Sequence, residues 1–355
     1  TIRTEASHSV ISRGRKRCGA SNSACRIRYT WETSGFTEEG QDESRFQGGI
    51  AYDHNSSTAC LPRYAFMIVS QHADAEVCRL ILKKSGSSFA LPLRFLTPEK
   101  RRGSNALYAF CRLADDIVDG DDRVSEKTRV LLEFEVMLKD ALHGKLVHEP
   151  VLRSIASAAM RYSIPHEHLF HIIEGVRRDL TQSRYETTDS LIQYCRLVAS
   201  AVGLAAVPIW GLRPGVSFEE WTPSADACGL AFQWTNILRD IVEDRERGRV
   251  YLPADSFHAS GCDVQDLLAG RIGPCFDNLA AMEVSRARSW FSEAMHLDSM
   301  LSVDGKRVFR AMFGVYRELL RSVENAGSSI FLQRVQTPKW RLPFIGVYSV
   351  LVGPR

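Results

Sequence analysis

The sequence predicts an all-α protein, and three observations support this. From about Leu80 onward, apolar residues recur at three- and four-residue intervals, the period of a helix with one face in a core. Glycine and proline stand between the periodic runs, and strict alternation over the length of a strand is almost absent. We therefore expect one large helical bundle over about residues 80–340. The expected helices are 99–119, 126–143, 149–162, 166–183, 188–211, 217–247, 276–298 and 303–334.

One of these runs differs from the others. Residues 188–211 are apolar on most faces, so this helix is expected to pass through the centre of the bundle. Gly203 and Pro208 predict a kink or a break within it.

The composition is that of a soluble globular chain. Of the 355 residues, 45% are hydrophobic and 25% charged, which excludes wholesale disorder, a collagen-like chain and a polytopic membrane protein. A net charge of +3 is too small to indicate a nucleic-acid partner. The nine cysteines include no C-x-x-C pair, so a disulfide framework or zinc ribbon is not expected and a reducing compartment fits better.

The two ends of the chain differ from the middle. Residues 1–60 form an N-terminal extension, whose first thirty residues carry seven Arg or Lys and one acid, Glu5. Two interpretations stay open: a disordered extension of a cytoplasmic or membrane-peripheral protein, or a transit peptide, which would place the protein in a plastid. The apolar tail 342–355 is too short to span a bilayer, so we expect at most a peripheral membrane contact there.

The first segment with candidate functional residues is ALYAFCRLADDIVDG, residues 106–120. On a helix, Tyr108, Arg112, Asp115 and Asp119 follow one another at i, i+4, i+7 and i+11 and form one stripe. Two carboxylates on one stripe are a typical arrangement for a hard cation with oxygen ligands. A solvated acidic helix end, closed by Gly120, would also explain them.

The second segment is GLAFQWTNILRDIVEDRERGRVYLP, residues 229–253. The same spacing places one set of polar residues on a single face: Gln233, Asn236, Asp240, Asp244 and Arg247. The other faces are too apolar for a surface helix, so these polar groups must be paired, hydrated or bound to a metal. Two such helices, each with Asp at i,i+4, favour a site shared between facing helices over a structural ion-pair network.

The surrounding residues suggest the substrate. Magnesium typically takes one or two carboxylates, and phosphate oxygens complete its shell. Cations that could bind a diphosphate are Arg112, Arg239, Arg247 and Arg249. Aromatic rings that could face a carbocation are Phe89, Tyr108, Tyr194, Phe232 and Tyr316, although core packing explains any one of them. Together these residues favour an apolar substrate with a Mg²⁺-bridged diphosphate head.

Residues 86–120 and 233–253, with YCRLVASAVGL (194–204) and VYRELLRSVENAGSSIFLQR (315–334), resemble the squalene/phytoene synthase family. The resemblance covers about residues 80–340 and implies an all-α isoprenoid synthase fold, a single-domain bundle with a central cavity between the two Asp-rich helices. It implies that Asp115 and Asp119 form one metal-binding pair and Asp240 and Asp244 the other. The resemblance also implies a catalytic role for Tyr194, Tyr108, Arg112 and Arg239. The positions that match the family's substrate-binding residues are Ser88, Phe89, Ala199, Val202, Gly203, Gln233, Asn236, Arg249, Tyr251, Tyr316 and Arg334.

The reaction that the resemblance implies is Mg²⁺-dependent, with Mn²⁺ as an alternative ion. Two prenyl diphosphates are joined head to head through a cyclopropylcarbinyl diphosphate, and the linear 1′-1 product forms after a second ionisation. The last cation loses a proton, or takes a hydride from NADPH if the product is squalene. The sequence contains no G-x-G-x-x-G fingerprint, which is weak evidence against NADPH because NADPH-using relatives also lack it.

The chain length of the substrate is open at this point. Ala90 and Asn105 stand where many relatives carry aromatic residues, and this favours the longer geranylgeranyl diphosphate and phytoene as product. The alternative is farnesyl diphosphate, giving presqualene diphosphate, squalene or dehydrosqualene.

Three other classes of protein share some of these sequence features. DDIVD (115–119) also fits head-to-tail prenyltransferases and terpene cyclases, but the second motif and RVYLP favour the head-to-head family. A metallohydrolase site at His166, Glu167, His168 and His171 lacks the H-E-x-x-H spacing, so we expect these residues on the surface at a helix start. A non-enzymatic binding module is disfavoured because all four aspartates are present.

Overall fold

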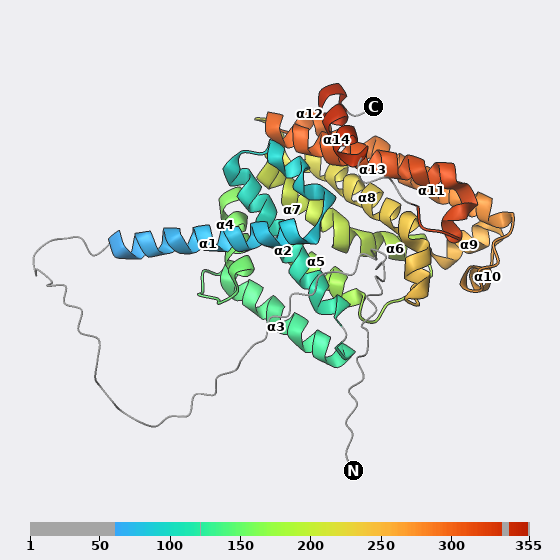
Figure 1. The fold of residues 1–355 in the computed structure, drawn as a ribbon, viewed down its shortest axis with the longest axis horizontal. Coiled ribbons are helices and arrows are strands. Elements are labelled where there is room, and N and C mark those ends of the chain that lie inside the picture. The colour runs from blue at the N-terminus through green and yellow to red at the C-terminus, as the bar shows by residue number, and fades with distance from the viewer. Residues whose placement is uncertain (1–60, 121, 336–340, 354–355) are drawn as a thin grey trace, which may run out of the picture. The chain divides into compact units, whose positions relative to one another are not determined.

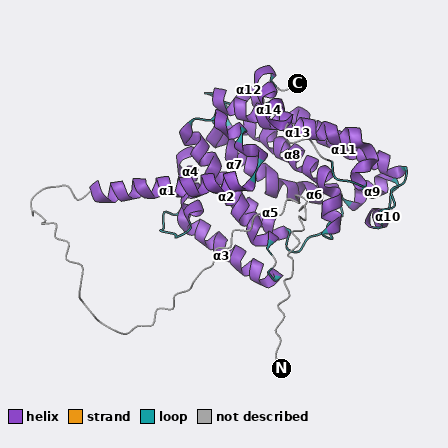
Figure 2. Cartoon of the chain, viewed as in Figure 1, coloured by secondary structure: helices purple, strands orange, loops and turns teal. Residues whose placement is uncertain are grey.

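The computed structural model describes residues 61–120, 122–335 and 341–353 (Figure 1). The predicted extension 1–60 lies outside these residues. Where the structure is described, the regular elements are helices (Figure 2), and the only β-type pairings are two isolated bridges, Arg184 with Val250 and Leu212 with Leu301. The prediction of an all-α fold is confirmed.

All eight predicted runs form helices, with ends shifted by a few residues. These helices are α2 (Pro98–Asp119), α3 (Val124–Leu142), α4 (Pro150–Tyr162), α5 (His166–Arg178), α6 (Thr188–Cys195), α7 (Ala201–Trp210), α8 (Phe218–Glu246), α11 (Cys275–Ala294), α12 (Leu297–Met300) and α13 (Val303–Ala326). Their starts follow local signals: Pro98 is the first residue of α2, and Ser217 and Glu220 form a reciprocal capping box at the start of α8.

Several elements were not predicted. They are α1 (Leu61–Ser85), α9 (Ala254–Ser260), α10 (Val264–Leu268), α14 (Arg341–Val352) and the 3₁₀ turns η1 (Ser88–Ala90) and η2 (Pro92–Phe95). Most of them are too short to display a helical period, and α14 is apolar on nearly every face. The end of the predicted run 303–334 forms a further 3₁₀ turn, η4 (Gly327–Phe331).

The helices enclose two main hydrophobic cores. One is built from residues of α1 to α5 and α7, with Phe110 and Ile155 at its centre. The other is built from α6, α8, α11 and α13, with Trp234 and Phe276 fully buried. Trp210, at the end of α7, packs against both, so α7 joins the two halves of the bundle.

The central run is continuous but irregular. A π-helical turn, η3 (Arg196–Ser200), separates α6 from α7, and α7 then continues through Gly203 and Pro208. A break at those two residues is therefore excluded, and the irregular turn lies before them, at Arg196–Ser200. The reason is close packing: a side chain on Gly229 of α8 would lie 2.5 Å from the Ser200 nitrogen, and one on Gly175 of α5 would lie 2.6 Å from Val198. The π turn is thus fitted between α5 and α8.

Among the described residues, one helical run, Thr188–Trp210, has the length and hydropathy of a membrane span. In this structure it is a core element, because it packs on α2 and α5 on one side and on α8 on the other.

Two smaller expectations need correction. Cys262 and Cys275 form a disulfide at the start of α11, although the cysteine pattern favoured reduced thiols, because the α9–α10 segment brings their Cα atoms to 5.5 Å. His168 is buried in the core, so the expectation of a surface position holds for His166, Glu167 and His171 but is wrong for His168.

Candidate active site

The first aspartate pair lies on the last turns of α2. Asp115 and Asp119 are both solvent-exposed. Even so, the surrounding protein withdraws enough water from Asp115 to raise the pKa of this carboxyl to about 7, and the charge of Asp119 adds to the effect. Arg112 does not relieve the charge by direct pairing, because its guanidinium bonds Asp116 at 2.5 Å.

The second pair lies on the C-terminal half of α8 and is paired with arginines. Asp240 accepts hydrogen bonds from both nitrogens of the Arg239 fork and from Arg334, whose Nε lies 3.0 Å from Oδ1. Arg334 also bonds Glu243 at 2.7 Å. Burial, followed by the charge of Asp240, raises the pKa of Asp244 to about 6.

Asp179, at the C-terminal end of α5, links the two pairs. Its carboxylate accepts hydrogen bonds from the hydroxyls of Tyr194, at 3.1 Å, and Tyr251, at 3.2 Å. Arg249 donates to the backbone carbonyl of the same residue at 3.2 Å. Burial raises the pKa of Asp179, against the opposing effects of the Tyr194 hydrogen bond and the Arg249 charge.

Charge interactions connect Asp179 with the first aspartate pair and, through Arg249, with the second. The charge of Asp179 acts on Asp115, and that of Asp119 acts on Asp179. On the other side, Arg249 acts on both Asp179 and Asp244. Asp179 and Arg249 therefore lie between the two aspartate pairs.

Sequence reasoning missed Asp179. One signal could have found it: a carboxylate at the C-terminal end of a helix is opposed by the helix dipole, so such a residue needs a compensating role.

Two aromatic groups adjoin the polar residues. In the first, Phe232 and Tyr316 stack at 4.0 Å between ring centres, and Phe89 contacts Tyr316 at 6.3 Å and Tyr108 at 6.5 Å. We call these four rings the aromatic wall. The Tyr108 hydroxyl donates to Ser85 at 2.8 Å.

In the second group, Tyr194 stacks on Tyr251 at 5.5 Å and tilts against Tyr185 at 5.4 Å. Tyr194 is only 3% exposed, and burial raises the pKa of its hydroxyl well above the ordinary value. The Tyr194 hydroxyl is therefore neutral at physiological pH and donates to Asp179.

The remaining expected residues lie on the same elements. Gln233 and Asn236 are half-buried on α8, and Asp244, Arg249 and Tyr251 line a pocket with apolar neighbours from α8 and α10. Ala199, Val202 and Gly203 lie on η3 and α7, where Gly203 faces the backbone of α8 at Ala225. Arg247 is exposed at the end of α8. Ser88 lies on η1, and its side chain is outside the described part of the structure.

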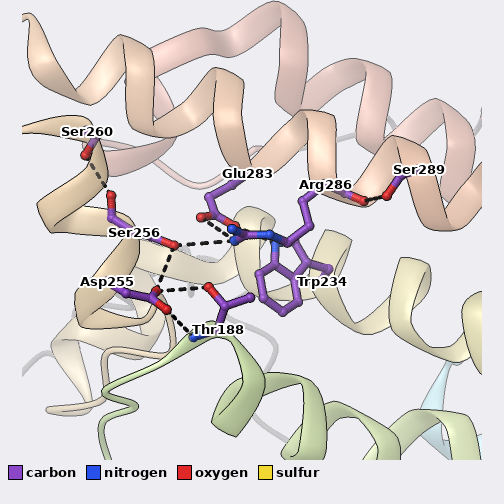
Figure 3. Close-up of polar contacts among 8 residues, drawn as sticks. All are labelled: Thr188, Trp234, Asp255, Ser256, Ser260, Glu283, Arg286 and Ser289. Carbon is purple, nitrogen blue, oxygen red and sulfur yellow. Dashed lines mark hydrogen bonds and ion pairs between the residues drawn. The ribbon is translucent and has the colours of Figure 1, made fainter.

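A polar cluster behind α8 fixes the rotation of this helix (Figure 3). The Trp234 indole donates to the fully buried Glu283 at 2.9 Å, Arg286 pairs with Glu283 at 2.6 Å, and the guanidinium lies 5.4 Å from the Trp234 ring. Trp234 precedes Asn236 by two residues and Asp240 by six, so it points to the opposite side of α8. Anchoring Trp234 therefore holds the polar stripe on the side of α8 that faces away from Glu283.

The donor set fits magnesium in combination with a phosphate ligand. Among the described residues, no three His, Cys, Asp or Glu side chains are close enough to hold one ion by themselves. Oxygen donors in pairs are what Mg²⁺ uses when substrate phosphates complete its shell. The raised pKa of Asp115 and the Asn236 Oδ1, which is buried without a hydrogen-bond partner, both indicate groups that a cation would satisfy.

The fold and the site together define a class: an all-α isoprenoid synthase with two aspartate pairs around an arginine- and tyrosine-lined region. The chain belongs to the squalene/phytoene synthase family, whose sequence model matches residues 82–341.

Curated relatives include phytoene synthase 1, chloroplastic, of Arabidopsis thaliana (34% identical over 77% of this chain and 66% of that protein) and 15-cis-phytoene synthase of Synechococcus elongatus (32%, 75% and 89%). The chain thus spans slightly less than two thirds of the Arabidopsis protein.

Solved structures give the same fold. They include a dehydrosqualene synthase in complex with ligand (TM-score 0.69, 27% identical, 79% of this chain and 96% of that one) and the squalene synthase HpnC of Alicyclobacillus acidocaldarius (0.68, 28%, 73% and 96%). The resemblance stated from the motifs is confirmed.

Proposed function

We propose that this protein is a Mg²⁺-dependent prenyltransferase that condenses two molecules of geranylgeranyl diphosphate head to head to phytoene, through a cyclopropylcarbinyl diphosphate. The observation that carries the proposal is the pair of aspartate motifs coupled through Asp179 and Arg249. Phytoene synthases of plants and of a cyanobacterium are among its relatives, which supports this product.

The metal would be held by the first pair, Asp115 and Asp119, and by the second pair, Asp240 and Asp244, with Asn236 beside it. When bound, Mg²⁺ would act as a Lewis acid on the leaving diphosphate.

The arginines bind and orient the diphosphates. Arg239, Arg249 and Arg334 already lie beside carboxylates or carbonyls of the site, so a diphosphate would replace these acceptors with its own oxygens. Arg112, one turn before Asp115, is placed to do the same for the first pair, and Tyr251 supports Arg249 through its hydroxyl.

The aromatic wall would face the cations formed after ionisation. Stacked rings present negative faces to a cation and exclude water that would otherwise quench it. Because the Tyr194 hydroxyl donates to Asp179, its oxygen lone pairs are turned away from that carboxylate. They could stabilise a cation, or accept the proton lost in the last step while the Tyr194 hydroxyl proton passes to the Asp179 carboxylate.

The choice of the longer substrate rests on residue size. Asn105 is buried on α2 with its Oδ1 unsatisfied, and Ala90 lies on η1 beside Phe89. Small side chains at both places leave more room for an alkyl chain. The second candidate is condensation of farnesyl diphosphate to presqualene diphosphate, squalene or dehydrosqualene, which the dehydrosqualene and squalene synthases among the structural relatives favour.

Incubation with each diphosphate, with and without NADPH and with EDTA as the metal-free control, separates the candidates by the mass of the extracted product. We expect a C40 hydrocarbon from geranylgeranyl diphosphate without NADPH, and none with EDTA. A C30 product alone would replace the first choice by the second.

The compartment is a separate proposal. The chloroplastic names of the plant relatives favour a transit peptide within residues 1–60 and a plastid location over a cytoplasmic one. A fluorescent fusion of residues 1–60 should enter isolated chloroplasts, and exclusion from them would contradict the plastid location.

A further inference from the structure

The segment from Cys262 to Cys275 is a loop closed by the disulfide between these two residues. It leaves the C-terminal end of α9, contains the short helix α10 and enters α11 at Cys275. In Figure 1 these elements lie together at one end of the bundle. We call residues 262–275 the disulfide loop.

One residue of the disulfide loop reaches the candidate active site. Leu267, on α10, is only 1% exposed, and it lines a pocket together with Asp244, Arg249 and Tyr251. The loop therefore forms one wall of a pocket that the second aspartate pair also borders.

Arg245 connects the disulfide loop to α8. It directly follows Asp244, so its side chain leaves the helix about 100° around the axis from that carboxylate. Its Nη1 donates to the Leu267 carbonyl at 3.1 Å and to the Phe331 carbonyl at 3.4 Å. One guanidinium nitrogen thus holds two segments that are far apart in the sequence.

The second acceptor, Phe331, lies close to a candidate substrate-binding arginine in the chain. Phe331 is fully buried at the end of η4, and its ring meets the Phe276 ring edge-on at 4.9 Å. Phe276 directly follows Cys275 of the disulfide. Three residues after Phe331, Arg334 pairs with Asp240. Arg245 and the disulfide loop therefore both hold the backbone from which Arg334 extends.

Arg334 needs this support because it is not part of a helix. The last 3₁₀ turn, η4, ends at Phe331, and residues 332–335 form a turn followed by irregular backbone. The position of a side chain on such a segment depends on what holds the neighbouring backbone. Because an arginine that binds a diphosphate must keep its guanidinium in place, a shift of this backbone would weaken binding.

We propose that Arg245 is a positioning residue for diphosphate binding that acts through Arg334, and that the disulfide keeps the two acceptors of Arg245 in place. In this role Arg245 contacts neither the diphosphate nor the metal. The role of Arg334 in binding comes from the proposed function. The physical basis of the inference is the shared hydrogen bond donor and the ring contact beside the disulfide.

Calorimetric titration of the full chain with inorganic diphosphate in the presence of Mg²⁺ tests the proposal. R245Q should raise Kd about fivefold and KM for geranylgeranyl diphosphate by a similar factor, while kcat stays within about twofold, because binding and not chemistry is affected. R271Q, which breaks the exposed pair with Asp266 inside the disulfide loop, is the matched control and should have the wild-type Kd. A wild-type Kd in R245Q would overturn the proposal.

A double variant tests whether Arg245 acts through Arg334. R334Q should raise Kd about tenfold, and R245Q/R334Q should bind little more weakly than R334Q alone, because both changes remove the same diphosphate contact. Losses that multiply in the double variant would mean that Arg245 acts independently of Arg334, and the proposal would then be wrong.

Reduction provides a test that does not depend on the folding of R245Q. Dithiothreitol transfers two electrons and two protons to the disulfide, which becomes two thiols, and is itself oxidised to a cyclic disulfide. The reduced wild-type chain and C262S/C275S should both bind diphosphate about threefold more weakly than the oxidised chain, because the loop is no longer closed. R245Q should not respond to reduction. An unchanged Kd in the reduced wild type, or an equal response in R245Q, would contradict the role of the disulfide.

Diphosphate binding also separates this proposal from the proposed function. If the chain binds diphosphate with the expected dependence on Arg245 but converts no prenyl diphosphate, the proposed function fails and the positioning role stands. If the chain makes phytoene and R245Q binds diphosphate like the wild type, only the positioning role fails.

Discussion

The two aspartate pairs look alike in the sequence but differ in the structure. On α2, Asp115 has no cationic partner among the described residues, because Arg112 pairs with Asp116, and desolvation together with the charge of Asp119 raises the pKa of Asp115 to about 7. On α8, Asp240 is 18% exposed in its side chain and is bonded by two arginines, Arg239 and Arg334. The two pairs therefore differ at their first members: Asp240 is paired with arginines and Asp115 is not, whereas Asp244, like Asp115, has a raised pKa.

This difference indicates how substrate and metal would bind. At Asp115 a metal cation can bind without displacing an arginine. The carboxylates of Asp115 and Asp119 already repel each other there, at some cost in stability. Around Asp240 the arginines must move to a diphosphate before the carboxylate is available to a metal. We therefore expect the first pair to bind metal with little rearrangement and the second to do so together with substrate.

The largest predicted effect is common to both pairs. Asp115→Ala and Asp240→Ala should each lower turnover on the order of 10³-fold or more, because either change removes a ligand of the ion that activates the leaving group. Product formation from geranylgeranyl diphosphate measures this, and far-ultraviolet circular dichroism checks that helical content is unchanged. Asp116→Ala, which removes the exposed partner of Arg112 and no proposed ligand, should cost only about threefold. Full activity in either of the first two variants would refute the metal assignment.

The next effect concerns the residue that links the pairs. Asp179→Asn should slow turnover about 100-fold, since an amide cannot accept hydrogen bonds from both tyrosines with the same charge. Tyr194→Phe should cost about tenfold, and the double variant should be little slower than Asp179→Asn alone, because both act through one hydrogen bond. The ratio of cyclopropylcarbinyl diphosphate to final product should rise in both variants. Additive losses with an unchanged ratio would assign Asp179 a purely structural role.

Helical periodicity predicted the two stripes because it depends only on the spacing of residues along one helix. It placed Tyr108, Asp115 and Asp119 on one face and Asn236, Asp240 and Asp244 on another. The pairing of Asp240 with Arg334, 94 positions away, depends on how η4 and α8 pack and has no local signal. The helix-end position of Asp179 is a local signal that it needs a partner, but its contacts with Tyr194 and Tyr251 depend on packing. The π turn also has no local signal, because Gly175 and Gly229 accommodate it from two other helices.

A smaller effect should distinguish the two pairs directly. Arg334→Gln removes one of the two guanidiniums on Asp240, an ion pair of about 1 kcal/mol at this partly exposed position. The Mg²⁺ concentration for half-maximal activity should therefore fall about fivefold, while KM for the prenyl diphosphate rises because a diphosphate contact is lost. Titration of Mg²⁺ at saturating substrate measures the first effect. Arg288→Gln, which breaks the exposed pair with Glu324, should change neither quantity. A higher Mg²⁺ requirement in Arg334→Gln would mean that Arg334 supports metal binding and does not compete with it.

The smallest effect is on stability, and it should have opposite signs at the two pairs. Since the pKa of Asp115 is raised from 3.8 to about 7 on folding, its contribution to stability is fully present below about pH 3.8 and is lost as the pH rises through 7. At pH 8 without metal, Asp115→Asn should therefore melt higher than the wild type. After discounting for the solvent exposure of this side chain, we expect a rise of about 2 °C, which shrinks toward pH 5. Asp240→Asn should melt lower, because it leaves Arg239 and Arg334 without their shared carboxylate. Thermal unfolding in EDTA at both pH values gives the comparison. Equal shifts in the two variants would show that the pairs are electrostatically equivalent, and the order of binding inferred from their difference would then have no basis.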